Sequence, residues 1–360
     1  MALIGGGTGG HVHPLIALAR ELASREEVEV VNFLSSRTAL AHRDIPGEVV
    51  ELRLAPLSLR RRPEGVLDYG LALCRSLRLM GKWRPRVAVA FGSYASLPPA
   101  MAAILLRIPL VIHEQNVVPG RANRLLAPLA KRCAVSFQET LAFAPYWTRK
   151  AEITGNPILR EPGRGDLGEA LRYFSLEEGR FTLGVVGGSQ GSRTLNRAVR
   201  EVLDLWEGRK DIQIVHSVGE RDYEEFSGLV SRDGGGLIYR PFRFIDRMDL
   251  LYGVADLMVC RAGASTVSEL AAHGCASVLV PFPYAGGHQM ENAMVLERAG
   301  AALVCEDREF SGAKLRDMVE GLMDDRSRLE EMKRRAAARG KPEAAKNLAD
   351  LVLRVAEERR

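Results

Sequence analysis

Short apolar segments recur along the chain, and most of them are followed by apolar residues at helical spacing. After the first segment, Leu15, Leu18, Ala19 and Leu22 repeat as on one buried face of a helix. The segments are residues 2–4, 28–34, 87–91, 110–113 and 133–136 in the first half, and residues 183–186, 212–215, 257–260 and 277–280 in the second. Buried strands that alternate with helices are typical of parallel sheets covered by helices on both faces. The pattern therefore predicts an α/β protein.

One break in this pattern divides the chain. Residues 154–157 read Thr-Gly-Asn-Pro and precede a polar, glycine-containing stretch at residues 160–168, which is typical of a hinge. We expect one parallel-sheet domain at residues 1–157 and a second at residues 158–341. A final amphipathic helix at about residues 342–360 is expected to pack back on the first domain. With 360 residues, 46% of them hydrophobic, the chain is long enough for two cores.

Two glycine-rich turns, about 180 residues apart, each follow an apolar strand and open a helix. Residues 5–10 read Gly-Gly-Gly-Thr-Gly-Gly, and residues 187–192 read Gly-Gly-Ser-Gln-Gly-Ser. Such a turn lets backbone N–H groups approach an anion at the positive end of the helix dipole, so it can bind phosphate. The glycines of a single turn can equally serve only to pack a helix closely against a strand. Because both halves carry the turn at matching places, we predict a phosphate-type turn in each.

The first turn also leaves a dinucleotide oxidoreductase open as an alternative. Gly5, Gly7 and Gly10 satisfy the G-x-G-x-x-G fingerprint. That fingerprint requires an acidic residue at the end of the second strand to bind the ribose of NAD, and here the strand is followed by Ser36 and Arg37. NAD is therefore disfavoured, whereas Arg37 keeps NADP open.

Polar clusters follow the predicted strands. In open parallel sheets, ligands bind beyond the carboxyl ends of the strands. We therefore expect the two domains to present these clusters to a shared cleft. The clusters are residues 92–94, 114–116, 187–191, 261–266 and 281–289.

In the second half, residues 263–270 are expected to form a helix N-terminus with Ser265 or Thr266 as the N-cap. Its amides suit a pyrophosphate. Glu269, about one turn into this helix, could accept hydrogen bonds from the two ribose hydroxyls of a nucleotide. Alternatively, Glu269 is only a favourable acid near the positive end of the helix.

In the first half, His11 ends the glycine turn and is a candidate general base, because a histidine can take a proton from a hydroxyl near neutral pH. His11 and His13 could instead be metal ligands, although the sequence offers no third ligand cluster and no D-x-D pair. Without a metal, a departing diphosphate must be neutralised by helix dipoles, amides and an arginine. Arg160 and Arg261 are the candidates. The chain has neither a G-x-S-x-G elbow nor a Walker phosphate loop.

The formal net charge of +5 is concentrated in one segment. Residues 53–86 contain nine basic and two acidic residues, interleaved with apolar ones that we expect to lie on an anionic membrane surface. These apolar residues are Leu71, Leu73, Leu77, Leu79, Met80 and Trp83. Alternatively, this is a solvated helix whose leucines face the core. Nucleic acid is a disfavoured partner, because one basic cluster lacks the aromatic ladder or recognition helix typical of its binders.

The cysteines and the N-terminal sequence indicate a reducing, intracellular setting. The five cysteines are scattered and include no C-x-x-C pair. The sequence leads directly from Met1 into the first turn, without a signal-peptide pattern, so we expect a protein that is not exported. The longest nearly apolar stretch, residues 94–106, contains two prolines and is too short to span a membrane.

Taken together, six segments resemble the MurG family of peptidoglycan glycosyltransferases and cover nearly the whole chain in family order. They are residues 6–12, 113–116, 154–157, 187–191, 260–264 and 289–293. The resemblance implies the two-domain GT-B fold, with two Rossmann-like sheets facing a cleft. It also implies an inverting, metal-independent enzyme without a cofactor. That enzyme would move N-acetylglucosamine from its UDP carrier to the N-acetylmuramoyl 4-hydroxyl of lipid I, forming lipid II in peptidoglycan synthesis.

The same resemblance implies roles for individual residues. Thr8, Gly9 and Gly10 would line the acceptor and sugar side, with Asn116 at the donor sugar, and Glu114 would be the second candidate base after His11. The donor UDP-N-acetylglucosamine would be held by Arg160, Ser189, Ile245, Ala264, Ser265, Thr266, Val267, Ser268, Glu269 and Gln289. Ile245 would contact the uracil and Glu269 the ribose. The family arginine two residues after the proline of Thr-Gly-Asn-Pro is Leu159 here, and Arg160 follows it.

The resemblance further implies peripheral attachment to the cytoplasmic face of the membrane and contact with other cell-wall synthesis proteins. It implies no nucleic acid partner. Besides the NADP oxidoreductase, a membrane-bound sugar-nucleotide sensor without turnover is the alternative from a different class. Binding of UDP rather than NADP argues against the first alternative. Acceptor-dependent release of UDP argues against the second.

Overall fold

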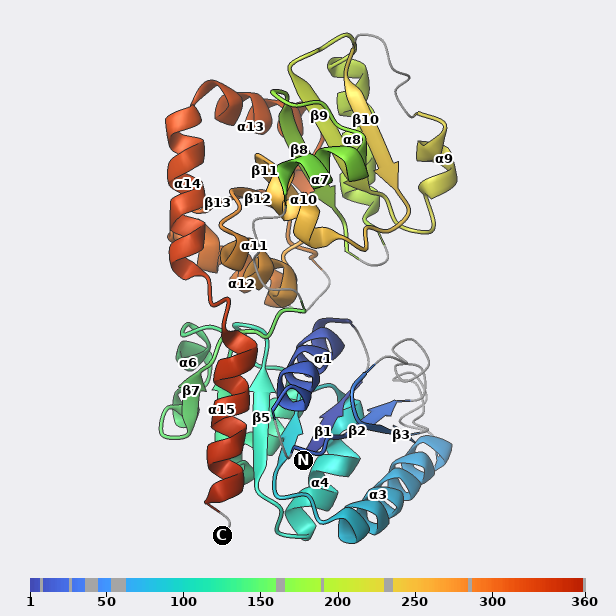
Figure 1. The fold of residues 1–360 in the computed structure, drawn as a ribbon, viewed down its shortest axis with the longest axis vertical. Coiled ribbons are helices and arrows are strands. Elements are labelled where there is room, and N and C mark those ends of the chain that lie inside the picture. Colours follow the sequence, from blue (N-terminus) through green and yellow to red (C-terminus); the bar gives the residue numbers. More distant parts are fainter. Residues whose placement is uncertain are drawn as a thin grey trace. The chain divides into compact units, whose positions relative to one another are not determined.

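The computed structural model describes residues 1–6, 9–25, 28–35, 45–52, 63–159, 166–188, 191–229, 236–283 and 287–358. Within it the chain divides into two compact units, each with its own sheet. Unit 1 comprises Met1–Leu159 together with Glu343–Arg360, and unit 2 comprises Arg160–Pro342. Every strand pairing in both sheets is parallel, so the predicted α/β class is confirmed for the described residues (Figure 1).

The sheet of unit 1 has the order β3-β2-β1-β4-β5-β6-β7 over the described residues. Its strands are β1 (Ala2–Gly5), β2 (Val31–Ser35), β3 (Glu48–Leu52), β4 (Ala88–Ala90), β5 (Leu110–Glu114), β6 (Arg132–Val135) and β7 (Ala151–Ile153). The order reverses between β1 and β4, which is the point where doubly wound sheets bind ligands at their carboxyl edge.

Helices cover both faces of this sheet. On one face, α1 (Gly9–Ala23) and α15 (Ala344–Glu357) share a core cluster with Leu3 and Leu34. On the other face, α3 (Pro63–Trp83) and α4 (Leu97–Leu105) pack over Ile4 and Phe33. Shorter elements complete the unit: η2 (Tyr94–Ser96), α5 (Arg121–Leu126), η3 (Ala127–Leu129), α6 (Thr140–Phe143) and η4 (Pro145–Trp147).

Helix α15 returns from unit 2 to unit 1 and lies beside α1 (Figure 1). Its apolar residues Leu348, Leu351, Val352 and Val355 recur at helical spacing and are fully or almost fully buried. Ion pairs fasten its polar side: Arg354 lies 2.6 Å from Glu152, and Arg25 lies 2.6 Å from Asp350. The last helix is therefore an integral layer of unit 1.

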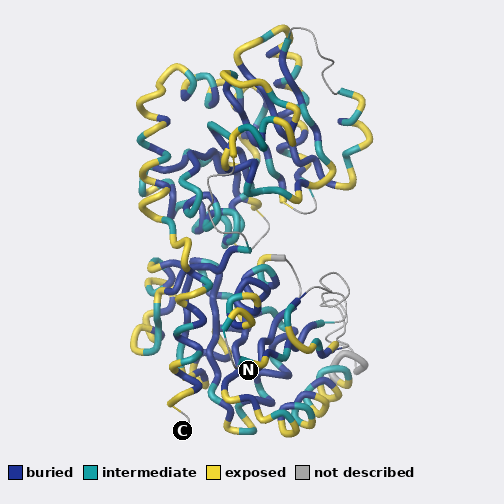
Figure 2. Tube along the Cα trace, in the orientation of Figure 1, coloured by how far each residue is buried: buried dark blue, intermediate teal, exposed yellow. Residues whose placement is uncertain are grey.

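Helix α3 corrects part of the membrane prediction. Leu73, Leu77, Leu79 and Trp83 pack against the core beneath the helix, and Met80 is fully buried. Only Leu71 of the six predicted apolar residues is exposed, together with Leu67 one turn earlier. The reason is that α3 is amphipathic, so its apolar stripe covers the sheet while its charged residues face outward. Figure 2 shows exposed positions recurring along this helix.

Unit 2 repeats the same winding with the strand order β10-β9-β8-β11-β12-β13 over its described residues. Its strands are β8 (Phe181–Val186), β9 (Ile212–Ser217), β10 (Ile238–Phe242), β11 (Leu257–Cys260), β12 (Ser277–Leu279) and β13 (Ala302–Val304). Its helices are α7 (Leu167–Phe174), α8 (Arg193–Leu205), α9 (Tyr223–Ser227), α10 (Met248–Val254), α11 (Ala264–His273), α12 (His288–Arg298), η5 (Asp307–Glu309), α13 (Gly312–Asp324) and α14 (Arg326–Arg339). The order reverses between β8 and β11, where the second predicted turn lies.

Candidate active site

In unit 1, the beginning of α1 meets the segment that follows β5. His11 is the third residue of α1 and is half-buried. Its Nδ1 atom lies 2.9 Å from Oε1 of Gln115, the first residue after β5. The structure thus joins two predicted clusters that are about 100 residues apart in the sequence. Gly9 and Gly10 are the first residues of α1, while Thr8 lies outside the described residues.

The contact with His11 continues inward through buried groups. Gln115 Nε2 lies 2.9 Å from Nδ1 of His113, and Nε2 of His113 lies 3.1 Å from the carbonyl oxygen of Gly155. The pKa of His113 is lowered to about 4: burial is the main cause, the bond to Gly155 opposes it, and the nearby His11 adds to it. His113 is therefore neutral at physiological pH, and this hydrogen-bond chain carries no charge behind His11.

Glu114, the second candidate base, is bound within its own loop. Its side chain is 1% exposed. Oε1 accepts from the backbone N–H of Asn116 at 3.0 Å, and Oε2 accepts from the N–H of Gly120 and from Nδ2 of Asn123, both at 2.9 Å. Because both oxygens already accept hydrogen bonds, Glu114 orders the loop that carries the predicted sugar-binding residue Asn116. A role as proton acceptor would require breaking these bonds.

In unit 2, the second glycine turn requires glycine for steric reasons. A Cβ atom on Gly187 would lie 2.6 Å from the backbone nitrogen of Ser192, and Gly191 has a φ of +73° with its Cα against Val218. Ser192 caps α8 through a bond from the N–H of Leu195. The turn therefore brings backbone close to the beginning of a 13-residue helix, as the phosphate interpretation requires. Ser189 lies outside the described residues, and so does Arg160.

The second helix N-terminus of unit 2 is that of α11, and it differs from the prediction in one respect. Its N-cap is Gly263 in an extended conformation, without a side-chain cap, so the predicted caps Ser265 and Thr266 instead lie in the first helical turn. The hydroxyl of Ser265 is buried and has no hydrogen-bond partner among the described residues. The first-turn amides of a helix likewise have no intrahelical acceptor. This end of α11 therefore offers several free donors to an anion. The predicted donor-binding residues from Ala264 to Glu269, including Val267 and Ser268, all belong to α11.

Glu269 is held by a residue that the sequence does not single out. Tyr252 of α10 donates its hydroxyl to Glu269 Oε2 at 2.7 Å. Burial raises the pKa of Glu269 to about 7, and the bond from Tyr252 acts in the opposite direction. With Tyr252 on one oxygen, the other carboxylate oxygen can accept from a diol. Glu269, the sixth residue of α11, is thus placed to accept a further hydrogen bond.

Two further predicted contacts are limited by the fold. Gln289 Oε1 accepts from the N–H groups of Ala262 and Phe282, at 3.2 and 2.9 Å. A ligand contact by Gln289 would therefore use Nε2. Ile245 is buried as a whole, with 2% of the residue exposed, so a base could contact little of it in this structure.

Arg261, one of the two arginines predicted to neutralise a diphosphate, already contacts several groups of its own unit. Its guanidinium donates to the carbonyl oxygen of Val280 at 3.0 Å, pairs with Asp307 at 2.5 Å and lies over the ring of Phe282. The side chain is 11% exposed. Arg261 therefore holds the loops after β11 and β12 together, and its charge already has an anionic partner in Asp307.

His113, Gln115 and Tyr252 are not among the predicted site residues. The first two could have been found, because adjacent polar residues at the end of a buried strand require partners. Tyr252 could not have been found, since it lies 17 residues before Glu269 on another helix and no local pattern links them.

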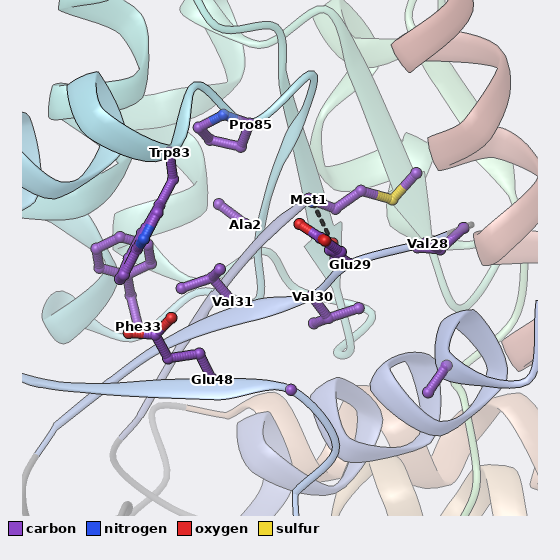
Figure 3. A pocket seen from close by; sticks show the side chains of 12 residues that line it. Met1, Ala2, Val28, Glu29, Val30, Val31, Phe33, Glu48, Trp83 and Pro85 are labelled. Atoms are coloured by element: carbon purple, nitrogen blue, oxygen red, sulfur yellow. Dashed lines mark hydrogen bonds between the residues drawn. The ribbon is translucent and has the colours of Figure 1, made fainter. Parts of the chain in front are cut away.

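A cavity of about 500 Å³ lies at the opposite edge of the unit 1 sheet (Figure 3). It is lined by residues at the amino ends of strands, including Val30 and Val31, and by Trp83 at the end of α3. It is therefore separate from the His11 cluster.

Across the described ranges, no helix is long and apolar enough to cross a membrane. Within those same ranges, no three His, Cys, Asp or Glu side chains gather as a metal ion would need.

Comparisons with known proteins agree with this arrangement. The N-terminal domain of glycosyltransferase family 28 matches residues 1–135, and its C-terminal domain matches residues 182–348. Two relatives bear the name UDP-N-acetylglucosamine--N-acetylmuramyl-(pentapeptide) pyrophosphoryl-undecaprenol N-acetylglucosamine transferase. The one from Nitrosococcus oceani is 40% identical over 364 residues and the one from Halothermothrix orenii 36% identical over 364 residues, each covering 98% of both chains.

Solved structures show the same architecture. The crystal structure of Acinetobacter baumannii MurG matches with a TM-score of 0.78 at 28% identity, covering 98% of this chain and 99% of that one. A putative UDP-N-acetylglucosamine 2-epimerase from Listeria monocytogenes matches with a TM-score of 0.71 at 13% identity, covering 99% and 97%, which is a likeness of fold alone. Since the family domains match both units and the relatives match their full length, this chain belongs to glycosyltransferase family 28 and has the GT-B fold.

Proposed function

We propose that the chain transfers N-acetylglucosamine from UDP-N-acetylglucosamine to the 4-hydroxyl of the N-acetylmuramoyl group of lipid I. The reaction forms a β-1,4 bond and releases UDP. One observation carries the proposal: relatives named for this transfer match 98% of the chain, so both the His11 cluster and the α11 N-terminus belong to the matched region. This family membership favours glycosyl transfer over the NADP oxidoreductase.

Unit 2 is the proposed donor site. The N-terminus of α11 and the turn at Gly187 supply amides for the diphosphate, and the dipoles of two helices stabilise the negative charge that builds up as UDP leaves. Glu269 accepts from the ribose diol through the oxygen that Tyr252 leaves free. Arg160 and Ser189 remain proposals that rest on the resemblance.

Unit 1 is the proposed acceptor site. His11 takes the proton of the acceptor hydroxyl while the oxygen attacks C1 of the sugar on the face opposite to the diphosphate, so the configuration at C1 inverts. The C1–O bond to the diphosphate breaks, and its electron pair leaves with UDP. His11 is preferred to Glu114, because both carboxylate oxygens of Glu114 already accept hydrogen bonds from its own loop.

We further infer that unit 1 docks on the cytoplasmic face of the membrane through the outer face of α3. Arg75, Arg78 and Lys82 are exposed there, in line with the exposed Leu67 and Leu71. Basic residues near an anionic surface are attracted by about 1 kcal/mol each. The rest of the predicted basic segment, residues 53–62, lies outside the described residues. Contact with other cell-wall synthesis proteins stays a prediction of the resemblance.

The decisive experiment is a transfer assay with labelled UDP-N-acetylglucosamine and a short-chain lipid I analogue. We expect labelled product, and we expect release of UDP only when the acceptor is present. Transfer should continue in excess EDTA, because helix dipoles and amides neutralise the leaving group. UDP binding without acceptor-dependent release would favour the sensor. Binding of NADP in place of UDP would favour the oxidoreductase.

A further inference from the structure

The hydrogen-bond chain behind His11 has a fixed direction. At its inner end, the carbonyl oxygen of Gly155 can only accept, so the hydrogen of neutral His113 lies on Nε2. Nδ1 of His113 is then an acceptor, and it takes a hydrogen from Gln115 Nε2. The second hydrogen of that amide points to the backbone oxygen of His113, 3.1 Å away. Both amide hydrogens are thus used, and the orientation of Gln115 is determined by two acceptors.

The consequence reaches His11. Because Gln115 presents Oε1 to Nδ1 of His11 and an amide oxygen can only accept, Nδ1 of His11 must carry the hydrogen. In the neutral ring, the lone pair is then on Nε2. In a neutral histidine, the hydrogen bond made by one ring nitrogen determines which of the two nitrogens can accept a proton.

We propose that Gln115 and His113 are positioning residues that hold His11 in the tautomer with the hydrogen on Nδ1. This makes Nε2 the nitrogen that accepts the proton of the acceptor hydroxyl, and that last step rests on the proposed function. Neither positioning residue touches the substrate. The series of hydrogen bonds behind His11 ends on the backbone carbonyl of Gly155 and not on a carboxylate. It therefore selects the tautomer without placing a negative charge behind the His11 ring.

The groups bonded to His11 through Gln115 carry no charge. The ionisable groups that face this cluster are His113, which burial keeps neutral, and Glu114, whose carboxylate is turned to Asn116, Gly120 and Asn123. His13 lies two residues further along α1. The bond between His11 Nδ1 and Gln115 Oε1 is therefore the contact that selects the tautomer.

The direct test measures the tautomer in the free protein. The chain contains seven histidines, so nitrogen-15 NMR of a histidine-labelled sample can resolve them, and the His11→Ala variant identifies the signal. We expect the His11 hydrogen on Nδ1 in the wild type at neutral pH. In Gln115→Met, which keeps the length of the side chain but removes Oε1, we expect a mixture of tautomers. A wild-type His11 with its hydrogen on Nε2 would overturn the proposal without any variant.

Kinetics supply the second test. Gln115→Met should lower kcat by about 10- to 100-fold, less than the about 10²–10⁴-fold loss typical of removing a general base. The KM for UDP-N-acetylglucosamine should not change, because Gln115 belongs to unit 1. Loss of kcat with an unchanged tautomer, or a normal kcat with mixed tautomers, would contradict the proposed mechanism.

A matched control exists in unit 2. His216 is also buried and neutral, and its Nδ1 lies 2.9 Å from the hydroxyl of Tyr239. Tyr239→Phe removes this bond but should leave both kcat and the His11 tautomer unchanged. The two proposals can also fail separately. If the chain transfers no sugar, the NMR result still decides the tautomer. If it transfers sugar with the hydrogen of His11 on Nε2, only the positioning proposal fails.

Discussion

A carboxyl group accepts hydrogen bonds from a diol best when it is ionised. The pKa of Glu269 lies close to neutral pH, so a small rise would protonate it. Burial raises its pKa to about 7, and the hydroxyl of Tyr252 opposes the rise by stabilising the charge. His11 differs, because its partner is a neutral amide. At the residue scale, the two proposed sites therefore use opposite means: unit 2 tunes the charge of an acid, and unit 1 fixes the orientation of a base.

Replacement of Glu269 by Ala should weaken UDP binding by about tenfold or more. The variant removes a charged hydrogen-bond acceptor, and such bonds typically contribute about 1.5–3 kcal/mol. Isothermal calorimetry with UDP measures the change. Glu225→Ala, at an exposed position of α9, is the matched control and should bind UDP normally. Equal affinity in both variants would remove Glu269 from the nucleotide site.

Glu269 should also make stability depend on pH. Its pKa is raised from 4.5 in the unfolded reference to about 7 in the folded protein, so the folded state binds more protons between those values. The free energy of unfolding contributed by this group is therefore highest below pH 4.5 and falls as the pH rises towards 7. Urea unfolding of the wild type and Glu269→Gln at pH 5 and pH 8 should show the wild type losing stability relative to the variant at pH 8. A constant difference between them would contradict the assignment.

The two candidate bases should separate catalysis from folding. His11→Ala should lower kcat by about 10²–10⁴-fold and leave Tm nearly unchanged, because His11 is half-buried and makes one bond. Glu114→Ala should lower Tm, since it removes the acceptor of the Asn116 and Gly120 N–H groups and of the Asn123 amide, and a buried donor left unpaired costs about 1–3 kcal/mol. Turnover and thermal melts on the same preparations decide the order. Normal turnover in His11→Ala, combined with loss of turnover at unchanged Tm in a Glu114→Gln variant, would reverse it.

At the scale of elements, the strands that the sequence predicts are the inner ones. Strands β1, β4 and β11 are buried on both faces and appear as uninterrupted apolar runs, and β5 and β8 are apolar except for His113, Glu114 and Thr182. The four strands that the sequence does not predict, β3, β7, β10 and β13, are the edge strands of the two sheets. Glu48 and Glu51 in β3 and Pro241 in β10 show why, since an edge strand faces solvent and its pattern is mixed.

The same reasoning explains which site residues could be predicted. The glycine turns and Glu269 stand next to inner strands or begin helices, so local sequence indicates them. The ion pair of Arg261 could not be predicted, because its partner Asp307 is distant in sequence and only the folded chain brings the two together. The apolar residues of α3 show a related limit, because composition alone does not say which side of an amphipathic helix meets the core.

The outer face of α3 should bind anionic vesicles. Changing Arg75, Arg78 and Lys82 together to Ser removes three exposed charges, each attracted by about 1 kcal/mol. Co-sedimentation should show wild-type binding that increases with the anionic lipid fraction and weakens with salt, and weaker binding in the triple variant. The control changes Arg328, Arg334 and Arg339 of α14, which are exposed on unit 2, and should bind normally. Equal losses in both triple variants would mean that net charge, and not α3, drives binding.

At the scale of the whole molecule, the chain passes between the units twice, after Leu159 and before Glu343. Two parallel sheets of the same winding are thus joined by a covalent path at each end of unit 2. The helix that makes the second crossing, α15, supplies buried residues to unit 1 although its sequence follows unit 2. The stability of unit 1 therefore depends on residues beyond the other unit.

Leu351→Ala tests this dependence. Leu351 is 1% exposed within the cluster shared by α1 and α15, and truncation of such a leucine typically costs about 2–5 kcal/mol. Hydrogen exchange followed by mass spectrometry should show faster exchange in peptides of α1 and β1 and unchanged exchange in β8 and α8. The exposed neighbour Arg354→Ala is the control and should cost far less. Faster exchange confined to α15 would show that unit 1 is stable without it.

The position of α15 also governs the order of events during synthesis. A ribosome completes residues 1–159 first, but the helix that covers the apolar side of α1 emerges about 185 residues later. At roughly 5–20 residues per second, that interval lasts roughly 10–40 s. Throughout it, the nascent first unit presents an uncovered layer of leucine and valine side chains to the cytosol or to a chaperone. A chain that ends before residue 344 would contain all of unit 2 but would lack the helix that covers the apolar side of α1. Folding of unit 1 is therefore completed only by the last helix to be synthesised.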